Sequence, residues 1–455
     1  MHIRDNKQEL DTVPTLVIGL GKTGLSCVRF LRTHGVPVAV TDSREDPPCL
    51  AELHSEFVDV EVALGGFDEK LFTWAQRLVV SPGVSVREPL ITSARLRGAE
   101  VLGDVEIFAR LAEAPIVAIS GSNGKSTVAT LLGKMINDAG KRVLVGGNIG
   151  CPVLGFLLEP VPDFYVLELS SFQLETTDSL NAKAAVVLNV SADHMDRYHD
   201  IDAYMAAKQR IFSGDGVQLI NRDDAVVVAM AGAGRNCISF GLGEPEGKNF
   251  GRSLRDKELW LARGSEQLMP VSELRIAGEH NQANALAALA LGDVIGLSMD
   301  VMLNTLKDFS GLPHRSQWVA QVDGVNWYND SKGTNVGATV SAIRGLPGPL
   351  LLIAGGQAKG ADFSGLRDVM VGKLRAVILL GEDAQKIAAV IAGEVPMVFA
   401  ADMHDAVRQA HAMAKGGDTV LLSPACASFD MFKGFEDRGE VFIEAVKALK
   451  QGVKA

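Results

Sequence analysis

The chain has 455 residues, which is more than one ordinary hydrophobic core holds and predicts about three domains. Its composition, 47% hydrophobic and 22% charged, is typical of a globular protein and argues against extensive disorder. A net charge of -11 leaves no broad basic surface for a polyphosphate backbone, so we do not expect nucleic acid as a partner.

The first ten residues, "MHIRDNKQEL", are polar and contain no apolar stretch of signal-peptide length. No run elsewhere reaches the roughly 18 uncharged apolar residues of a membrane span. We therefore expect a cytoplasmic protein with no membrane partner. The five cysteines are scattered and form no C-x-x-C pair, which favours buried reduced thiols over a zinc or redox site.

Short apolar runs alternate with helix-period stretches, which is the pattern of βαβ units with parallel sheets. The runs include "TLVIGL", "VPVAV", "PIVAIS", "KRVLVG", "FYVLELS", "AAVVLNV", "PLLLIAG", "AVILLG" and "TVLLSPA". The pattern restarts at Pro115 and again after "SGLPHRSQW" (310–318). We expect an α/β protein of three domains: a Rossmann-like domain (1–103), a central P-loop domain with a mostly parallel sheet (104–311), and a Rossmann-like C-terminal domain (312–455). Residues 230–275 predict a small antiparallel edge or insertion.

The first glycine-rich turn, "VIGLGKTGLS" (17–26), supplies Gly19, Gly21 and Gly24 in the G-x-G-x-x-G spacing. A helix-like stretch then ends near Leu31, and Asp42 closes the next apolar run. In dinucleotide-binding folds such a turn and the following helix N-terminus hold a diphosphate. One hypothesis is therefore an NAD-dependent oxidoreductase, although a nucleotide-sugar carries the same diphosphate group.

A second glycine-rich turn lies in "APIVAISGSNGKSTVATLLGKM" (114–135), again between an expected strand and helix. Gly121, Gly124, Lys125 and Ser126 match the end of a P-loop, in which the Lys reaches terminal phosphates and the Ser hydroxyl binds Mg²⁺. Ile119 stands where the strict motif has Gly, so the loop is shortened. We expect ATP to bind here. A P-loop NTPase that hydrolyses ATP without an acceptor is a further hypothesis.

Two residues near expected strand ends are candidate metal ligands. Glu168 lies in the run "FYVLELS", and His194 lies in "VSADHMDRY", past the run "AAVVLNV". Ligands bind open α/β sheets at the carboxyl ends of their strands, which favours both positions. Mg²⁺ prefers oxygen ligands, so a structural role for His194 is as well supported as metal binding.

Together these motifs resemble the Mur ligases, ATP-dependent amino-acid ligases that build the stem peptide of peptidoglycan. The likeness covers nearly the whole chain and is strongest to the members that add D-glutamate. It is carried by "SGSNGKST", "LELSSFQLE", "DHMDRY", "AAKQRIF", "GEHNQANALAALA", "LPHR", "NDSKGTN" and "LLSPACASFDMFKGFEDRG". We expect a monomer. The resemblance implies domains that bind, in chain order, UDP-N-acetylmuramoyl-L-alanine, ATP and D-glutamate. It also implies two Mg²⁺ ions, with Mn²⁺ as a substitute.

The implied reaction is an amide ligation. ATP phosphorylates the alanyl carboxylate, the amine of D-glutamate attacks the acyl phosphate, and the tetrahedral intermediate loses phosphate. A related ligase with another amino acid is the alternative within the family. An oxidoreductase would leave the second glycine-rich turn without a use.

The resemblance implies catalytic and metal-binding roles residue by residue. Lys125 and Ser126 would hold the phosphates and the first Mg²⁺, with Glu168 sharing that ion and His194 holding a second. Lys208, by itself a solvated helix lysine, matches a lysine that the family carbamylates into a metal ligand. Asn281, by itself a helix cap, joins the nucleotide site. The implied ATP-binding set is Gly121, Ser122, Asn123, Gly124, Lys125, Ser126, Thr127, Asn281, Asn284, Arg315, Asp330 and Lys332.

The other two substrate sites also follow from the resemblance. The implied UDP-substrate set is Gly21, Lys22, Thr23, Asp42, Ser43, Arg44, Ser81, Gly83, Asn148, Gln173 and His194. The implied D-glutamate set is Thr334, Lys359, Ser428, Phe429 and Phe435. Gln357 and Ala358 stand where relatives often have an acidic residue before Lys359, which leaves the hydrogen bonding around this lysine open.

Overall fold

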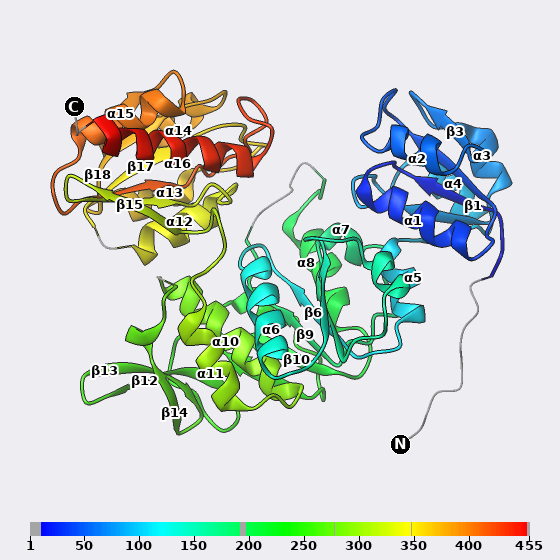
Figure 1. The fold of residues 1–455 in the computed structure, drawn as a ribbon, viewed down its shortest axis with the longest axis horizontal. Helices are drawn as coiled ribbons and strands as arrows, with labels where there is room; N and C mark the ends of the chain where they lie inside the picture. Colours follow the sequence, from blue (N-terminus) through cyan, green and yellow to red (C-terminus); the bar gives the residue numbers. More distant parts are fainter. Residues whose placement is uncertain (1–10, 192–196, 277, 347, 453–455) are drawn as a thin grey trace.

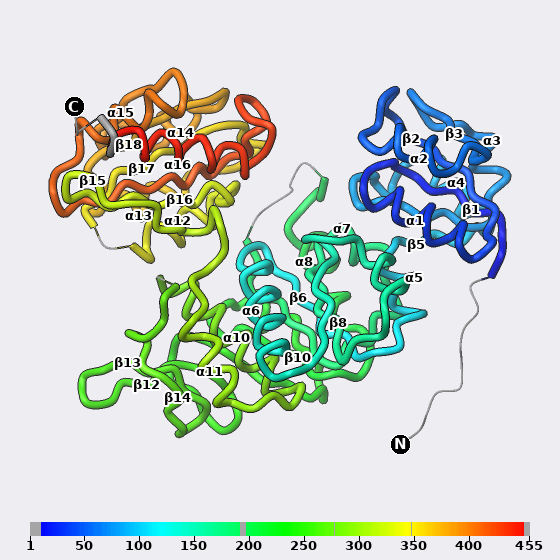
Figure 2. The backbone as a smooth tube through the Cα atoms, in the orientation of Figure 1, coloured from blue at the N-terminus to red at the C-terminus, as the bar shows by residue number. Residues whose placement is uncertain are grey.

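The structure, a computed structural model, describes residues 11–191, 197–276, 278–346 and 348–452. Three α/β domains follow one another along the chain (Figure 1). Each contains its own sheet, of five, nine and six strands. In the tube view of Figure 2 the N-terminal and C-terminal domains lie apart, and the central domain lies next to both. The expected fold class is therefore confirmed.

The N-terminal sheet is parallel, with strand order β3-β2-β1-β4-β5. Alternate residues of β1 face opposite sides of the sheet, as the strand period requires. Val17 packs in a cluster with α1 and α5, whereas Leu16 and Ile18 pack with α3 and α4. The elements are β1 (Thr15–Ile18), α1 (Lys22–Thr33), β2 (Val38–Asp42), α2 (Leu50–Glu56), β3 (Glu61–Leu64), α3 (Glu69–Trp74), β4 (Arg77–Val80), α4 (Pro89–Leu96) and β5 (Glu100–Leu102), and α5 (Asp104–Leu111) connects this domain to the central one.

The N-terminal and central domains share a hydrophobic core across α5. Phe108 of α5 packs edge-on against Tyr165 of β8, with ring centroids 4.9 Å apart, and against Phe156 at 6.4 Å. Residues of α1 belong to the same buried cluster as residues of β6, β8 and β9. These two domains are therefore held together by buried apolar contacts as well as by the chain.

The central sheet has the order β14-β13-β12-β11-β10-β9-β6-β8-β7. It is parallel from β12 to β7, and β12, β13 and β14 form antiparallel pairs at one edge, which confirms the antiparallel edge expected within 230–275. The helices α6 and α10 cover one face of β6. The elements are β6 (Ile116–Ser120), α6 (Lys125–Asp138), β7 (Val143–Gly147), η1 (Val153–Leu158), β8 (Phe164–Glu168), α7 (Ser171–Leu174), β9 (Ala184–Val187), α8 (Ile201–Gln209), η2 (Arg210–Phe212), β10 (Val217–Asn221), α9 (Ala225–Ala229), β11 (Cys237–Phe240), β12 (Phe250–Arg255), β13 (Glu258–Arg263), β14 (Glu266–Pro270), η3 (Val271–Glu273), α10 (Glu279–Val294) and α11 (Met299–Asp308).

The C-terminal sheet has the order β15-β16-β20-β17-β18-β19, and only the edge strand β15 is antiparallel to its neighbour. Helices α12 to α14 pack on one face, and α15 and α16 pack on the other. The elements are β15 (Gln317–Val322), β16 (Val325–Asn329), α12 (Val336–Gly345), β17 (Leu350–Ala354), α13 (Ser364–Met370), β18 (Leu374–Leu379), α14 (Ala384–Ile391), β19 (Met397–Phe399), α15 (Met403–Met413), β20 (Thr419–Leu422) and α16 (Phe435–Gly452).

Two expectations about buried and apolar segments can be compared with this fold. Cys27, Cys49 and Cys426 are buried, but Cys151 and Cys237 are exposed, so the expectation of buried thiols is wrong for those two. Cys151 lies in the turn after β7, and Cys237 begins β11, which pairs with β12 only at its far end. Within the described part of the chain, none of the helices combines the length and apolar character needed to traverse a bilayer.

Candidate active site

The second glycine-rich turn joins β6 to α6 and depends on two glycines. Gly124 has φ = +86° and Gly121 has φ = +148°, which a side chain would strain. A Cβ on Gly124 would lie 2.4 Å from Asn284 Oδ1 of α10, so the neighbouring helix also excludes a larger residue. The turn leads into the N-terminus of α6, where free backbone N–H groups favour a phosphate.

Two lysines converge on this turn. Lys125 Nζ donates to the carbonyls of Gly121 at 2.8 Å and Ser122 at 2.9 Å. Lys208 Nζ of α8 donates to the same Gly121 carbonyl at 3.0 Å. The turn therefore carries concentrated positive charge, which suits a triphosphate. Lys208 is 2% exposed, so its interpretation as a solvated helix lysine is wrong.

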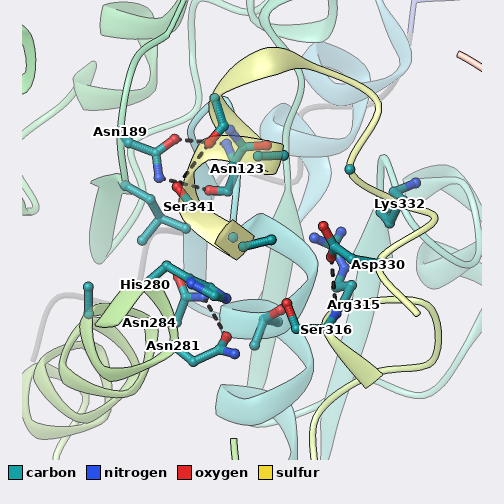
Figure 3. Close-up of a pocket in the computed structure, with 18 of the residues that line it drawn as sticks. Asn123, Asn189, His280, Asn281, Asn284, Arg315, Ser316, Asp330, Lys332 and Ser341 are labelled. Carbon is teal, nitrogen blue, oxygen red and sulfur yellow. Dashed lines mark hydrogen bonds between the residues drawn. The ribbon is translucent and has the colours of Figure 1, made fainter. Parts of the chain in front are cut away.

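A pocket of about 350 Å³ lies beside the turn, between the central and C-terminal domains. Figure 3 shows His280, Asn281 and Asn284 on α10, with Arg315, Ser316, Asp330 and Lys332 across from them. The predicted ATP residues that line it are Asn123, Gly124, Thr127, Asn281, Asn284, Arg315, Asp330 and Lys332. The remaining predicted ATP residues, Gly121, Ser122, Lys125 and Ser126, belong to the adjoining turn and the first turn of α6.

Several polar side chains of the pocket were not among the predicted ligands: Asn189, Asn221, His280, Ser316 and Ser341. Asn189 holds the phosphate turn in place, because its Oδ1 accepts from Asn123 N at 2.8 Å and its Nδ2 donates to Asn123 O at 3.1 Å. It lies near the end of the apolar run "AAVVLNV" and just past β9, so the strand-end rule that selected Glu168 would also have found it.

The asparagines of α10 form an amide pair on the pocket wall. Asn284 Nδ2 donates to Asn281 Oδ1 at 3.2 Å. The residue that precedes α10 is Gly278, with φ = +95°, and Asn281 lies inside the first turn. The interpretation of Asn281 as the helix cap is therefore wrong, because this glycine occupies the capping position.

The C-terminal domain brings two cations and a carboxylate to the pocket. Arg315 NH2 donates to Ser126 Oγ at 2.8 Å, and burial lowers the pKa of this guanidinium. Asp330 accepts from Ser316 N at 3.0 Å and from Ser423 Oγ at 2.8 Å. Burial nevertheless raises the pKa of Asp330 to about 6.

Lys332 extends over the aromatic ring of Phe435, with its Nζ 3.6 Å from the ring centroid. Burial, followed by the charge of Arg315, lowers the pKa of this lysine to about 8. Phe435 begins α16, so the first turn of that helix supports a cation of the nucleotide pocket. A desolvated ammonium is a strong partner for a phosphate, because its charge is poorly screened there.

The donor atoms of the proposed metal ligands show whether these residues suit a magnesium ion. Glu168 ends β8 and is 2% exposed, and its Oε1 accepts from Asn148 Nδ2 at 3.0 Å. Its Oε2 is buried without a hydrogen-bond partner among the described residues. A buried carboxylate oxygen without a partner among the described residues and the Ser126 hydroxyl are oxygen donors of the kind that Mg²⁺ prefers, so these residues fit the ion. His194 lies outside the described residues.

The first glycine-rich turn is closely packed. A Cβ on Gly24 would lie 1.9 Å from the carbonyl oxygen of Gly19, so α1 approaches the turn only because this residue is glycine. Ser81 Oγ donates to the same carbonyl at 2.8 Å, which ties the loop after β4 to the turn. Asp42 accepts from Leu20 N at 2.7 Å.

Several residues of the implied UDP-substrate set lie at or just after the ends of the first two strands. Asp42 is buried and pairs with the Arg44 guanidinium at 2.7 Å. Burial opposes the charge of this carboxylate, but its hydrogen bonds outweigh burial and lower its pKa to about 2. The Asp42 carboxylate is thus already bonded within the protein. A Cβ on Gly21 would meet no atom within 4 Å, and four further predicted residues remain open to a ligand: Lys22, Ser43, Arg44 and Gly83 are exposed.

Known protein domains match the chain in succession. "Mur ligase MurD-like, N-terminal domain" matches residues 14–103, "Mur ligase middle domain" matches 119–292, and "Mur ligase, glutamate ligase domain" matches 314–426. The UDP-N-acetylmuramoylalanine--D-glutamate ligase of Nitrosococcus oceani is 54% identical over 437 residues, covering 96% of this chain and 96% of that protein. The chain belongs to the Mur ligase family.

Two other comparisons agree with this assignment. The protein of the same name from Pseudomonas fluorescens is 54% identical over 438 residues, covering 95% of this Mur ligase and 98% of that protein. The crystal structure of UDP-N-acetylmuramate-alanine ligase from Thermotoga maritima has the same fold, with a TM-score of 0.60 at 16% identity, covering 96% of this chain and 99% of that one. The resemblance drawn from the sequence motifs is therefore confirmed.

Three of the predicted D-glutamate residues of this Mur ligase, Lys359, Ser428 and Phe429, lie in two neighbouring loops of the C-terminal domain. Lys359 is exposed, and its Nζ is 5.6 Å from the ring centroid of Phe429, which is 66% exposed. Gln357 and Ala427 exchange backbone hydrogen bonds at 3.0 and 2.9 Å, which joins the two loops. Ser428 is buried next to this bridge. Thr334 is exposed and follows Lys332 by two residues. The ring of Phe435 packs under the Lys332 ammonium.

Gln357, in the loop after β17, has a defined environment. Its Nε2 donates to Glu382 Oε2 at 3.5 Å, and the next residue, Ala358, donates from its backbone N to Asp383 Oδ2 at 2.6 Å. Acidic side chains from the turn before α14 therefore support this loop. Lys359 itself has φ = +50°, a left-handed conformation that is strained for a lysine.

Proposed function

We propose that this Mur ligase joins D-glutamate to UDP-N-acetylmuramoyl-L-alanine and converts ATP to ADP and phosphate, in cytoplasmic peptidoglycan-precursor synthesis. The observation that carries the proposal is the pocket beside the phosphate turn, which cations of the next domain complete. Relatives more than half identical over nearly the whole chain carry the name of this activity. We propose domain boundaries at 103 and 311, and a monomer, because two domains of one chain supply both walls of the pocket.

The reaction needs activation because a carboxylate is anionic and has no good leaving group. Transfer of the terminal phosphoryl group of ATP to the alanyl carboxylate oxygen releases ADP and forms an acyl phosphate. The D-glutamate nitrogen then bonds to the carbonyl carbon and loses a proton. The tetrahedral intermediate collapses by breaking the carbon–oxygen bond to phosphate, which leaves the amide. The site must therefore hold several anions together and stabilise the charge that develops.

The ATP-binding roles follow from the positions of the cations. Lys125, on the phosphate turn, reaches the terminal phosphates, and Arg315 and Lys332 approach them from the C-terminal domain. Asn281 and Asn284 form the opposite wall of the nucleotide pocket. A domain closure that brings such groups together completes the site only when substrate is present.

The metal-binding roles rest on oxygen donors. Ser126 and Glu168 would hold Mg²⁺, which screens the phosphate charge when bound. The proposal includes a second ion at His194, and Mn²⁺ as a substitute. Lys208 would join these ligands as a carbamate; its burial and its hydrogen bond to the phosphate turn place it close to Lys125.

The other two substrates are assigned to the outer domains. The first glycine-rich turn, with Asp42 and Arg44, would bind the UDP end, and Asn148 and Gln173 would bind nearer the reacting carboxylate. Lys359, Ser428 and Phe429 would hold D-glutamate, with Thr334 and Phe435 nearby. The oxidoreductase hypothesis is not retained, because the first domain matches a Mur ligase domain and the P-loop would have no use in such an enzyme.

The test is an assay of phosphate release from purified protein with UDP-N-acetylmuramoyl-L-alanine, ATP, Mg²⁺ and one amino acid at a time. We expect release that depends on D-glutamate. Release with no amino acid would indicate a simple NTPase, and release driven equally by L-glutamate or L-alanine would indicate a different ligase. Either result would overturn the proposal.

A further inference from the structure

Arg197 connects the central domain to the N-terminal domain beside the proposed UDP site. It lies before α8, and its side chain is 14% exposed. NH1 donates to the Pro82 carbonyl at 2.9 Å, and NH2 donates to the Val84 carbonyl at 2.7 Å. One guanidinium thus holds two carbonyls of a single loop in the neighbouring domain, a two-point contact that fixes orientation as well as distance.

The loop that Arg197 holds also contacts the first glycine-rich turn. It follows β4 and turns tightly, because Val84 N donates to the Ser81 carbonyl at 2.9 Å. Ser81 Oγ in turn donates to the carbonyl of Gly19 at 2.8 Å. A displacement of this loop would therefore be passed to the turn that we assign to the UDP diphosphate.

The other side of Arg197 is fixed within the central domain. Its guanidinium carbon lies 4.3 Å from the ring centroid of Phe172, and NH2 lies 3.4 Å from Glu175 Oε2. Phe172 belongs to α7, next to Gln173. Gln173 is 4% exposed, and its Oε1 accepts from Ser170 N at 3.0 Å in a capping box that begins this helix. Arg197 therefore joins the loop of the UDP site to the helix that carries Gln173.

We propose that Arg197 is a positioning residue that sets the register between the UDP end of the substrate and the part of the site in the central domain. A substrate that spans two domains binds well only if the distance between its two subsites is fixed. Arg197 fixes that distance through the loop 81–84 on one side and α7 on the other. The inference rests on the proposed function, because it needs a substrate that reaches from one domain to the other.

The experiment compares Arg197→Met and Arg197→Lys with a matched variant, Arg235→Met. Arg235 also donates to two carbonyls, Phe212 at 3.1 Å and Gly216 at 3.0 Å, but both lie within the central domain and outside α7. We would measure KM for each of the three substrates, kcat, and the thermal midpoint. Calorimetric binding of UDP alone to the same variants gives a readout without turnover.

We expect Arg197→Met to raise KM for UDP-N-acetylmuramoyl-L-alanine roughly tenfold while KM for ATP stays within about twofold. The KM of Arg197→Lys for this substrate should lie between the wild-type and Arg197→Met values, because an ammonium cannot hold both carbonyls in one plane. Arg235→Met should lower the thermal midpoint without this KM change. An unchanged KM, or equal rises in all three KM values, would overturn the inference. If Arg197→Met does not fold, Arg197→Lys decides by the same criteria. Wild-type protein that lacks D-glutamate-dependent release would instead contradict the proposed function, and UDP binding would then decide the role of Arg197.

Discussion

Arg315 of the C-terminal domain donates a hydrogen bond of 2.8 Å to the hydroxyl of Ser126 in the central domain. The same hydroxyl is a proposed Mg²⁺ ligand, and the Arg315 guanidinium also feels the charge of Glu168. Asn123 and Asn335 make a second contact between these domains, with their side-chain amides 3.4 Å apart. The C-terminal domain therefore touches the phosphate turn and α6 directly, and we propose that nucleotide binding replaces the Arg315 contact with contacts to phosphate.

The Arg315 contact predicts that this residue cannot be replaced by lysine. We expect Arg315→Lys and Arg315→Ala to lower kcat/KM for ATP by about a hundredfold, because a guanidinium binds phosphate oxygens in pairs and an ammonium does not. Steady-state phosphate release would measure the change. Arg275→Lys is the matched control, since Arg275 is an exposed arginine paired with Asp308 at 3.6 Å. A lysine variant with normal kcat/KM would rule out the paired contact.

The position of Lys125 predicts a loss of turnover without a loss of the fold. In Lys125→Ala we expect kcat to fall by at least about a hundredfold, because the terminal phosphates lose a preorganised cation. Lys134 lies on the same helix and is exposed in an ion pair with Asp138 at 2.9 Å, so Lys134→Ala should leave kcat unchanged. Rate measurements, with circular dichroism to check folding, would compare the two variants. Near-normal turnover in folded Lys125→Ala would remove the proposed role.

The elements of this fold could be predicted from the sequence wherever apolar runs and glycine-rich turns coincide. "PIVAIS" followed by Gly121 and Gly124 is β6, the phosphate turn and α6, because local sequence fixes both the strand and the left-handed turn. Glu168 and Asn189 follow the same rule, since parallel strands end at one edge. Burial was harder to predict. Lys208 is polar and lies on a helix, and only the packing of α8 against the phosphate turn buries it.

Side-chain contacts with backbone groups and neighbouring loops could not be predicted from the sequence patterns. Arg197 binds carbonyl oxygens, which every residue has, so no side-chain motif could have indicated its partners Pro82 and Val84. The family resemblance placed Asp42 in the UDP-substrate set, but its carboxylate already accepts from Leu20 and Arg44. A strand end indicates where a site lies. Which atoms remain available for a ligand depends on the neighbouring loops.

The lowered pKa of Lys332, about 8, predicts that kcat/KM for ATP decreases at alkaline pH. The protonated form binds phosphate, so kcat/KM for ATP should fall as the pH rises through about 8, since this parameter reports the free enzyme. Unfolding does not explain the fall. Between about 8 and the unfolded value near 10.4 the unfolded state holds more protons at this residue, so its contribution to stability becomes more favourable as the pH rises.

Lys332→Arg tests the origin of this decrease. An arginine keeps its charge throughout the range, so the decrease should move to higher pH or disappear while the thermal midpoint is followed in parallel. Rates would be measured from about pH 6 to 10 with ATP below its KM. If Lys332→Arg is active and its kcat/KM for ATP still falls as the pH rises through about 8, Lys332 is not the group responsible.

The strained backbone of Lys359 allows a selective test of the amino-acid site. D-Glutamate carries two carboxylates, and the exposed Lys359 ammonium lies 5.6 Å from the ring centroid of Phe429, the residue after Ser428. Asn tolerates a left-handed φ, so Lys359→Asn removes the charge while keeping the turn at φ = +50°. We expect KM for D-glutamate to rise roughly tenfold, as for loss of one hydrogen bond to a charged group, with KM for ATP unchanged. Lys307→Asn is the control, because Lys307 is a lysine of the central domain that is 46% exposed and pairs with Glu273 at 2.8 Å. Equal KM values for D-glutamate in both variants would show that Lys359 does not bind this substrate.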